Sequence, residues 1–167
     1  MEKIIEGAIF KMGNNINTDV IIPGKYLMYT DPDELAKYAF SVMGPEYTER
    51  LKQFDIIVAG ENFGCGSARE QGATAIKGLK MKAVLARSFA RVFYRNAINT
   101  GLPIVECPDA VDAVKEGDRI TIDFSEGKVK TAQKEFSFAP LPESVFEILN
   151  SGGLVEYLKT NIANKEY

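Results

Sequence analysis

The stretch that decides the fold of this chain is Gly60-Glu61-Asn62-Phe63-Gly64-Cys65-Gly66-Ser67-Ala68-Arg69-Glu70-Gln71. It follows an apolar run over residues 54–59 and leads into a helix-like segment over residues 70–77. This order predicts a strand that ends in a glycine-rich loop, which then opens a helix. Backbone N–H groups of such a loop can point at an anion, and the helix N-terminus adds partial positive charge. With Ser67 and Arg69 at the helix start, we predict a carboxylate-binding site there.

The loop does not fit the common phosphate-binding patterns. A dinucleotide fingerprint needs glycine at the position that Arg69 occupies, and a P-loop needs a lysine and a spacing that are absent here. Spacing alone therefore leaves an alternative open, in which the stretch is a plain strand-to-helix turn with Ser67 as its N-cap.

The segments around the loop alternate between strand and helix. Strands are expected at 54–59, 81–86 and 102–107, with helices at 69–78 and at 88–99, the second capped by Ser88 and ended by Gly101. Such alternation predicts a parallel sheet with right-handed crossovers. The sequence therefore predicts an α/β fold.

The flanking segments extend this sheet. A first strand is expected at 3–10, an extended piece at 19–23, and a helix from Asp31 to Phe40. Short strands at 119–124, 129–131 and 134–138 suit antiparallel hairpins, and helices are expected at 142–150 and 154–164. We expect one domain over residues 1–167, with a mixed, mostly parallel sheet flanked by helices.

Composition excludes several classes of function. The chain has 167 residues and a net charge of −3, which does not favour nucleic acid or an acidic membrane surface as partner. No apolar run approaches the length of a membrane span, and the N-terminus has no signal-peptide architecture, so a cytoplasmic protein is expected.

Two cysteines and no histidine restrict the chemistry further. Cys65 and Cys107 are too few to hold a zinc or iron–sulfur site alone, so we expect no metal on this chain. Both cysteines are interpreted as structural. Without histidine there is no imidazole base and no Ser-His-Asp triad, so any acid–base chemistry uses other groups or a partner.

Several separated motifs resemble the swivelling domain of the aconitase family. They are Gly60 to Glu70, Ser88 to Phe93, Asn99 to Ile104, and Asn17 to Pro23. The resemblance runs from about Asn14 to Tyr157 and is greatest to the stand-alone small subunits of 3-isopropylmalate dehydratases. It implies the swivelling β/β/α fold.

The resemblance also implies roles for individual residues. Ser67 takes the position of the base that removes a proton next to a carboxylate, and Arg69 that of the residue binding the carboxylate. Gly66, Ala68 and Asp19 are placed at the substrate by the same resemblance. Ala68 stands where mitochondrial aconitase has a second serine, which argues against a tricarboxylate. The alternatives are an N-cap Ser67 with a solvent-exposed Arg69, and an Asx-turn Asp19.

Substrate choice is expected to lie in the loop Tyr26-Leu27-Met28-Tyr29, which in the family faces the variable group of the substrate. Its apolar character suits an isopropyl group, since an unpaired carboxylate would be costly to bury there. Lys25 is a nearby cation, short apolar substituents also fit, and the loop could instead pack into its own core or against a partner.

The resemblance implies half of a hydro-lyase. A [4Fe–4S] cluster is expected on a separate large subunit, because this chain lacks the cysteines, and this chain supplies the base and the specificity loop. The implied reaction interconverts 2- and 3-isopropylmalate by dehydration and rehydration, in leucine biosynthesis. A hydro-lyase for citramalate, 2,3-dimethylmalate or homoaconitate remains open, as does a non-catalytic carboxylate- or nucleotide-binding module.

Overall fold

The computed structural model describes residues 2–67 and 69–163, and seven of its strands form one sheet in the order β4-β3-β2-β1-β5-β6-β7. The strands are β1 (Ile4–Lys11), β2 (Ile56–Ala59), β3 (Ala83–Ala86), β4 (Ile104–Glu106), β5 (Arg119–Asp123), β6 (Lys128–Lys130) and β7 (Glu135–Ser137). Strands β1 to β4 pair in parallel, with Ile9 opposite Ile56 in the register of β1 and β2. Strands β5 to β7 continue from β1 in antiparallel fashion, with Ile5 opposite Ile122. The predicted α/β fold with a mixed sheet is therefore confirmed, but the sheet is not mostly parallel: three of its strand pairs are parallel and three are antiparallel.

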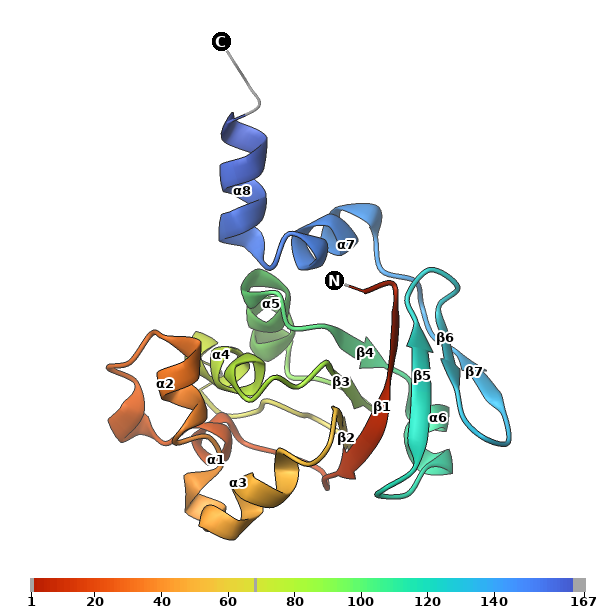
Figure 1. The fold of residues 1–167 in the computed structure, drawn as a ribbon, viewed down its shortest axis with the longest axis horizontal. Helices are drawn as coiled ribbons and strands as arrows, with labels where there is room; N and C mark the ends of the chain where they lie inside the picture. Colours follow the sequence, from red (N-terminus) through yellow and green to blue (C-terminus); the bar gives the residue numbers. More distant parts are fainter. Residues whose placement is uncertain (1, 68, 164–167) are drawn as a thin grey trace.

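Helices cover the two faces of the sheet unequally (Figure 1). They are α1 (Thr18–Ile21), α2 (Pro32–Ala36), α3 (Pro45–Leu51), α4 (Glu70–Gly78), α5 (Arg91–Thr100), α6 (Pro108–Ala113), α7 (Glu143–Asn150) and α8 (Leu154–Ala163), with 3-10 turns η1 (Gly24–Tyr26) and η2 (Ser41–Met43). Helices α2, α4 and α5 pack on the face that carries Phe10, Ile57 and Val84. The opposite face, with Ile56 and Leu85, packs against α6 and the inner side of β5 and β6.

The strands flanking the glycine-rich loop are apolar because both of their faces are buried. All four residues of β2 and all four of β3 are buried, as expected of parallel strands covered on both sides. The chain leaves these strands at their carboxyl ends, where ligands bind in open α/β sheets. The segments that follow β1, β2 and β3 meet at this edge.

Some local predictions were wrong because capping side chains changed the backbone path. The piece 19–23 is extended only at Ile22 and Pro23, because Asn17 Oδ1 accepts a hydrogen bond from the Asp19 N–H at 2.8 Å and starts α1. Ser88 does not cap α5, whose N-cap is Ala90, because the Ser88 hydroxyl accepts instead from the Asn62 N–H. The helix from Asp31 ends at Ala36, and α3 and α6 were not predicted.

Two polar anchors fix the outlying parts of the chain. The half-buried Lys77 donates from Nζ to the carbonyls of Thr100 at 2.6 Å and Gly152 at 2.8 Å, which ties α5 to the turn before α8. Asp123 Oδ1 accepts from the Ser125 hydroxyl at 2.6 Å and shapes the β5–β6 turn. Figure 1 shows α8 extending away from the sheet, so Lys77 holds the base of this helix.

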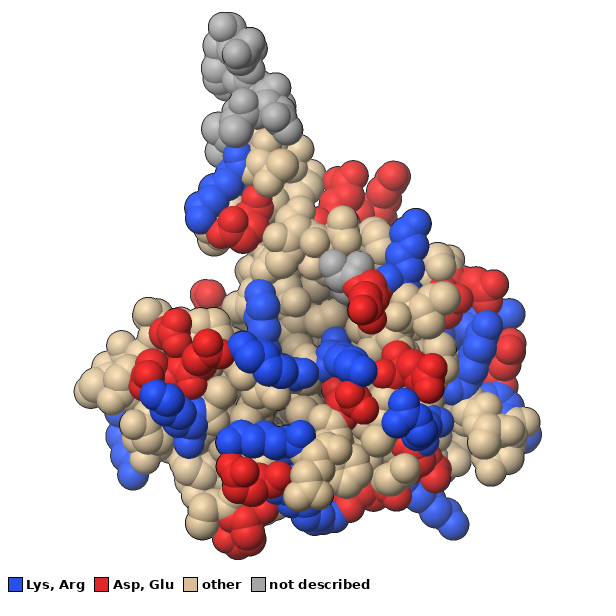
Figure 2. Space-filling view, viewed as in Figure 1, with Lys and Arg blue, Asp and Glu red and all other residues tan. Residues whose placement is uncertain are grey.

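Charged side chains are mixed on the surface. In the view of Figure 2, Lys and Arg alternate with Asp and Glu and form no continuous field of one sign on that face. None of the helices in the described ranges 2–67 and 69–163 combines the length and the apolar character that a membrane span requires.

Candidate active site

The glycine-rich loop is held by backbone hydrogen bonds to both of its neighbours. It pairs in parallel with residues 16–18, which follow β1, and with residues 88–90, which follow β3. The bonds are Gly64 N–H to Ile16 O (2.8 Å), Thr18 N–H to Cys65 O (2.9 Å), Phe63 N–H to Ser88 O (3.0 Å) and Ala90 N–H to Phe63 O (2.9 Å). The three segments predicted from separate motifs therefore meet as one unit at the carboxyl edge.

Two glycines allow this close approach. Gly64 and Gly66 have φ values of +79° and +86°, a region that side-chain-bearing residues rarely adopt. A Cβ on Gly64 would enter the ring of Phe93, and one on Gly66 would lie 2.5 Å from Asn17 Oδ1. Glycine at 66 thus leaves room for the Asn17 side chain that caps α1.

Ser67 lies beyond this glycine pair and is exposed. Its Oγ is 3.5 Å from the Oγ1 of Thr18. The N-cap of α4 is Arg69, which caps with no side-chain hydrogen bond, so Ser67 precedes the cap by two residues. The alternative of Ser67 as N-cap is therefore wrong, and its hydroxyl is not committed to the first turn of α4.

Arg69 is exposed, and no salt bridge involves it within the described residues. Arg87, in contrast, pairs with Asp112 and lies 3.5 Å from Glu61 of the loop. The Asp112 carboxylate raises the pKa of Arg87 through a hydrogen bond and its charge. Arg87 therefore serves the scaffold of the loop, while the Arg69 guanidinium is open to an anion.

The remaining predicted site residues lie around this centre. Asp19 is the second residue of α1, is exposed, and follows Thr18 directly. Ala68 lies outside the described residues. The structure thus brings Asp19, Gly66, Ser67 and Arg69 to one edge of the sheet.

The predicted specificity loop divides into packed and exposed parts. Tyr26 stacks on Tyr38 with ring centroids 4.0 Å apart, and Tyr29 stacks on the same ring at 5.6 Å. Leu27 is half-buried against the core. Met28 is 79% exposed, so it alone of the four presents most of its side chain outward.

This loop also touches the start of α4. Gln71 Nε2 donates to the Leu27 carbonyl at 3.3 Å, two residues after Arg69. Thr30 and Glu70 line a pocket of about 140 Å³ between the two segments. The specificity loop and the Ser67–Arg69 segment therefore border the same surface.

Contacts between distant side chains and loop backbone were missed from the sequence. Thr18 lies inside the motif Asn17 to Pro23, but no role was predicted for it from the sequence. Asn14 Oδ1 accepts from the Glu61 N–H at 2.8 Å and fills the space where a Cβ on Gly60 would be. The sequence features that could have indicated this contact are the pair of asparagines after β1 and the glycine at position 60.

Comparisons with known proteins show relatives over nearly the whole chain. The aconitase C-terminal domain model matches residues 2–110. The isopropylmalate/citramalate isomerase small subunit of Methanocaldococcus jannaschii is 45% identical over 99% of this chain and 100% of its own length. The 3-isopropylmalate dehydratase small subunit of Halothermothrix orenii is 47% identical over 95% of this chain and 97% of its own. The crystal structure of 3-isopropylmalate dehydratase from M. jannaschii has a TM-score of 0.86 and 44% identity, covering 96% of each chain.

This chain belongs to the aconitase C-terminal domain family, among the 3-isopropylmalate dehydratase small subunits. The family resemblance carried by the sequence motifs is confirmed. The roles of the individual residues stay predictions.

The residues present do not fit an iron–sulfur cluster. Cys107 is buried at the start of α6, where burial raises the pKa of its thiol, and Cys65 lies in the loop. Within residues 2–67 and 69–163, no three His, Cys, Asp or Glu side chains gather as metal ligands. No chemical step on this chain is therefore assigned to a metal.

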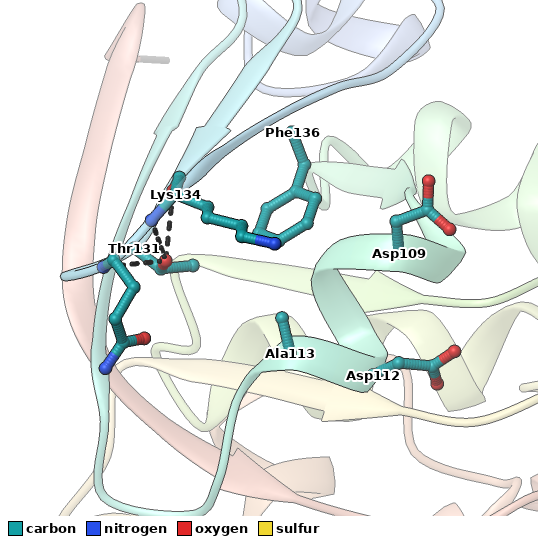
Figure 3. Close-up of a pocket in the computed structure, with 7 residues that line it drawn as sticks. Asp109, Asp112, Ala113, Thr131, Lys134 and Phe136 are labelled. Atoms are coloured by element: carbon teal, nitrogen blue, oxygen red, sulfur yellow. Dashed lines mark hydrogen bonds between the residues drawn. The ribbon is translucent and has the colours of Figure 1, made fainter.

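A pocket of about 410 Å³ lies away from the loop, between α6 and the β6–β7 hairpin (Figure 3). Asp109 and Asp112 lie on one side of it, and Lys134 and Phe136 on the other. Asp112 is the partner of Arg87, so its charge is already compensated. This hollow contains none of the residues that the sequence assigned to the site.

Proposed function

We propose that this chain is the small subunit of a 3-isopropylmalate dehydratase, a cytoplasmic hydro-lyase in leucine biosynthesis, with one swivelling domain over residues 1–167. The observation that carries the proposal is 47% identity to a curated small subunit across 97% of that subunit's length. The partner is a large subunit that bears the [4Fe–4S] cluster.

In this proposal Ser67 is the base. Its Oγ, as alkoxide, takes the proton from the carbon next to a substrate carboxylate: the C–H bond breaks, a Ser67 O–H bond forms, and the electron pair becomes the C=C bond as the neighbouring hydroxyl leaves. The acceptor of that hydroxyl is on the partner. Hydration at the other carbon reverses these steps and gives the isomer.

Arg69 binds the carboxylate of the substrate. Its exposed guanidinium, which forms no salt bridge within residues 2–67 and 69–163, offers two parallel N–H donors that match the two oxygens of a carboxylate. The N-terminus of α4 adds partial positive charge that stabilises both the carboxylate and the Ser67 alkoxide. Backbone N–H groups of Gly66 and Ala68 and the carboxylate of Asp19 complete the proposed substrate contacts.

Replacing Ser67 tests the proposal. Ser67→Ala, reconstituted with the large subunit, is expected to lose at least about 10²–10⁴-fold in kcat, as losing a general base does. Ser144→Ala, at an exposed position of α7, is the matched control and should keep wild-type turnover. Near-normal turnover of Ser67→Ala would refute the role of Ser67. The isolated chain should not hydrate isopropylmaleate or citraconate, and turnover without a second protein would refute the half-enzyme proposal.

The specificity loop is tested at its exposed residue. Met28→Arg should lower kcat/KM for isopropylmalate, because it puts a charge where the isopropyl group would pack, and raise it for homoaconitate, whose extra carboxylate gains a partner. Val155→Arg is the control, at an apolar position on α8 that is 62% exposed. If the ratio of the two kcat/KM values does not move with Met28→Arg, the loop does not select the substrate.

A second substrate is favoured by one specific observation. The M. jannaschii relative, 45% identical over its full length, is named for both isopropylmalate and citramalate. Citramalate carries a methyl group, which an apolar loop also accommodates. Comparing kcat/KM for isopropylmalate and citramalate on the same reconstituted enzyme separates a single-substrate from a dual-substrate enzyme.

A further inference from the structure

A buried threonine hydroxyl lies beside the serine. Thr18 is the first residue of α1 and only 2% of its surface is exposed. Its Oγ1 donates to the Cys65 carbonyl at 3.2 Å and lies 3.5 Å from Ser67 Oγ. The second distance is at the outer limit of a hydrogen bond, and such contacts in catalytic sites often tighten once substrate is bound.

The Cys65 carbonyl has a second donor. The Thr18 backbone N–H reaches the same oxygen at 2.9 Å. The hydroxyl of Thr18 can therefore turn away from Cys65 without leaving that carbonyl unpaired, which would otherwise be costly. The backbone bridge between residues 17 and 65 holds the geometry during this rotation.

We propose that Thr18 is a positioning residue for Ser67, whose hydroxyl turns between the Cys65 carbonyl and Ser67 Oγ during turnover. This rests on the proposed role of Ser67 as base. While Ser67 is an alkoxide, the Thr18 O–H donates to it. When Ser67 takes the substrate proton, the Thr18 O–H returns to the Cys65 carbonyl, and the new Ser67 O–H can donate to Thr18 Oγ1. No proton leaves Thr18 in this exchange.

The side chain of Thr18 allows its two functions to be separated. Its methyl group packs over α4, since a Cβ built on Gly72 would lie 3.5 Å from Thr18 Cγ2. Thr18→Val keeps this packing and removes the hydroxyl, whereas Thr18→Ser keeps the hydroxyl and removes the methyl group. The charged and titratable neighbours along the contributing segments, Asp19, Cys65 and Arg69, remain in both variants.

The experiment compares the two variants as assembled enzyme with the large subunit. Thr18→Val should lower kcat about 10²-fold with little change in KM, within the range expected for loss of support to a general base. The pH profile of kcat should shift toward higher pH, because the Ser67 alkoxide loses the hydrogen bond from the Thr18 hydroxyl. Thr18→Ser should keep kcat within about threefold of the wild type, although removal of the methyl group lowers its melting temperature.

Two outcomes would overturn the proposal. One is an equal kcat for Thr18→Val and the wild type. The other is a loss of kcat in Thr18→Ser that is as large as in Thr18→Val and that parallels the loss of stability, which is the result expected of a purely structural residue. Ser67→Ala measured in parallel separates a failure of the proposed role of Ser67 from a failure of the inference about Thr18. If Ser67→Ala stays active, the role of Ser67 and this inference both fail; if it is inactive while Thr18→Val is normal, only this inference fails.

Discussion

Replacing Gly66 by alanine tests how the loop and α1 share space. The φ of +86° is strained for any residue with a Cβ, at about 1–2 kcal/mol. The added Cβ would lie 2.5 Å from Asn17 Oδ1, so the Asn17 side chain must leave its cap on the Asp19 N–H. Loss of such a cap costs about 1 kcal/mol. Gly66→Ala should therefore lower the free energy of unfolding by about 2–3 kcal/mol, the sum of these two terms.

A double-mutant cycle separates the two terms. Asn17→Ala alone should cost about 1 kcal/mol, and the double variant about the same as Gly66→Ala, because the cap is lost only once. The assay is urea unfolding of the isolated chain at pH 7. Gly13→Ala is the matched control, since a Cβ there would meet nothing within 4 Å. If Gly66→Ala unfolds like Gly13→Ala, or if the two costs add fully, the steric argument fails.

Three further predictions concern the anchors and the anion site. Hydrogen bonds from the Ser125 hydroxyl, and from backbone N–H groups of the turn, hold the pKa of the Asp123 carboxyl below its usual range. The ionised carboxylate therefore stabilises the fold above about pH 4, and this contribution is lost as the pH falls further. In urea unfolding, the stability advantage of the wild type over Asp123→Asn should shrink from pH 7 to pH 3, and a constant difference would contradict this. Lys77→Met should lower the free energy of unfolding by about 1–3 kcal/mol, because the carbonyls of Thr100 and Gly152 lose their donor. The control Lys80→Met removes an exposed ion pair and should change it by under about 1 kcal/mol. Equal effects of the two substitutions would refute the role of Lys77 as an anchor. Arg69→Lys in the assembled enzyme should raise KM strongly, because lysine cannot make the two-pronged bond, while the same change at the exposed Arg95 should not; equal KM values would remove Arg69 from the carboxylate site.

The sheet around the loop was predictable from the sequence because its signals are local and strong. Strands β2 and β3 are short apolar runs with one helix, α4, between them, and that order predicts parallel pairing. The Asp31 cap with Pro32 at the first helical position also predicted where α2 begins, and Asp31 Oδ1 accepts from the Glu34 N–H at 2.9 Å.

Two of the errors, the caps predicted at Ser88 and Ser67, arose where contacts with distant segments decide the backbone. Ser88 has the composition of a helix cap, but its hydroxyl is taken by Asn62, 26 residues earlier in the chain. The alternative of Ser67 as an N-cap was wrong for a related reason. Ser67 Oγ lies beside the Oγ1 of Thr18, a residue 49 positions earlier in the chain, and the N-cap of α4 is Arg69. Capping patterns describe the local choices of a residue, and they cannot include an acceptor or donor from another strand.

The same limit applies to the specificity loop, where contacts with distant residues reduce the number of side chains that could contact a substrate. The apolar residues between Tyr26 and Tyr29 looked like one surface in the sequence, but stacking on Tyr38 and packing of Leu27 commit most of them to the fold. These residues are partly buried against the core, and the Gln71 side chain binds the Leu27 carbonyl, which links the loop to the start of α4. Under the proposed role of this loop, Met28 is the side chain of the four that is most available to a substrate. Since Met28 is an unbranched, adaptable side chain, it favours apolar substituents without defining one shape, which is the physical reason that isopropylmalate and citramalate both remain compatible with this loop.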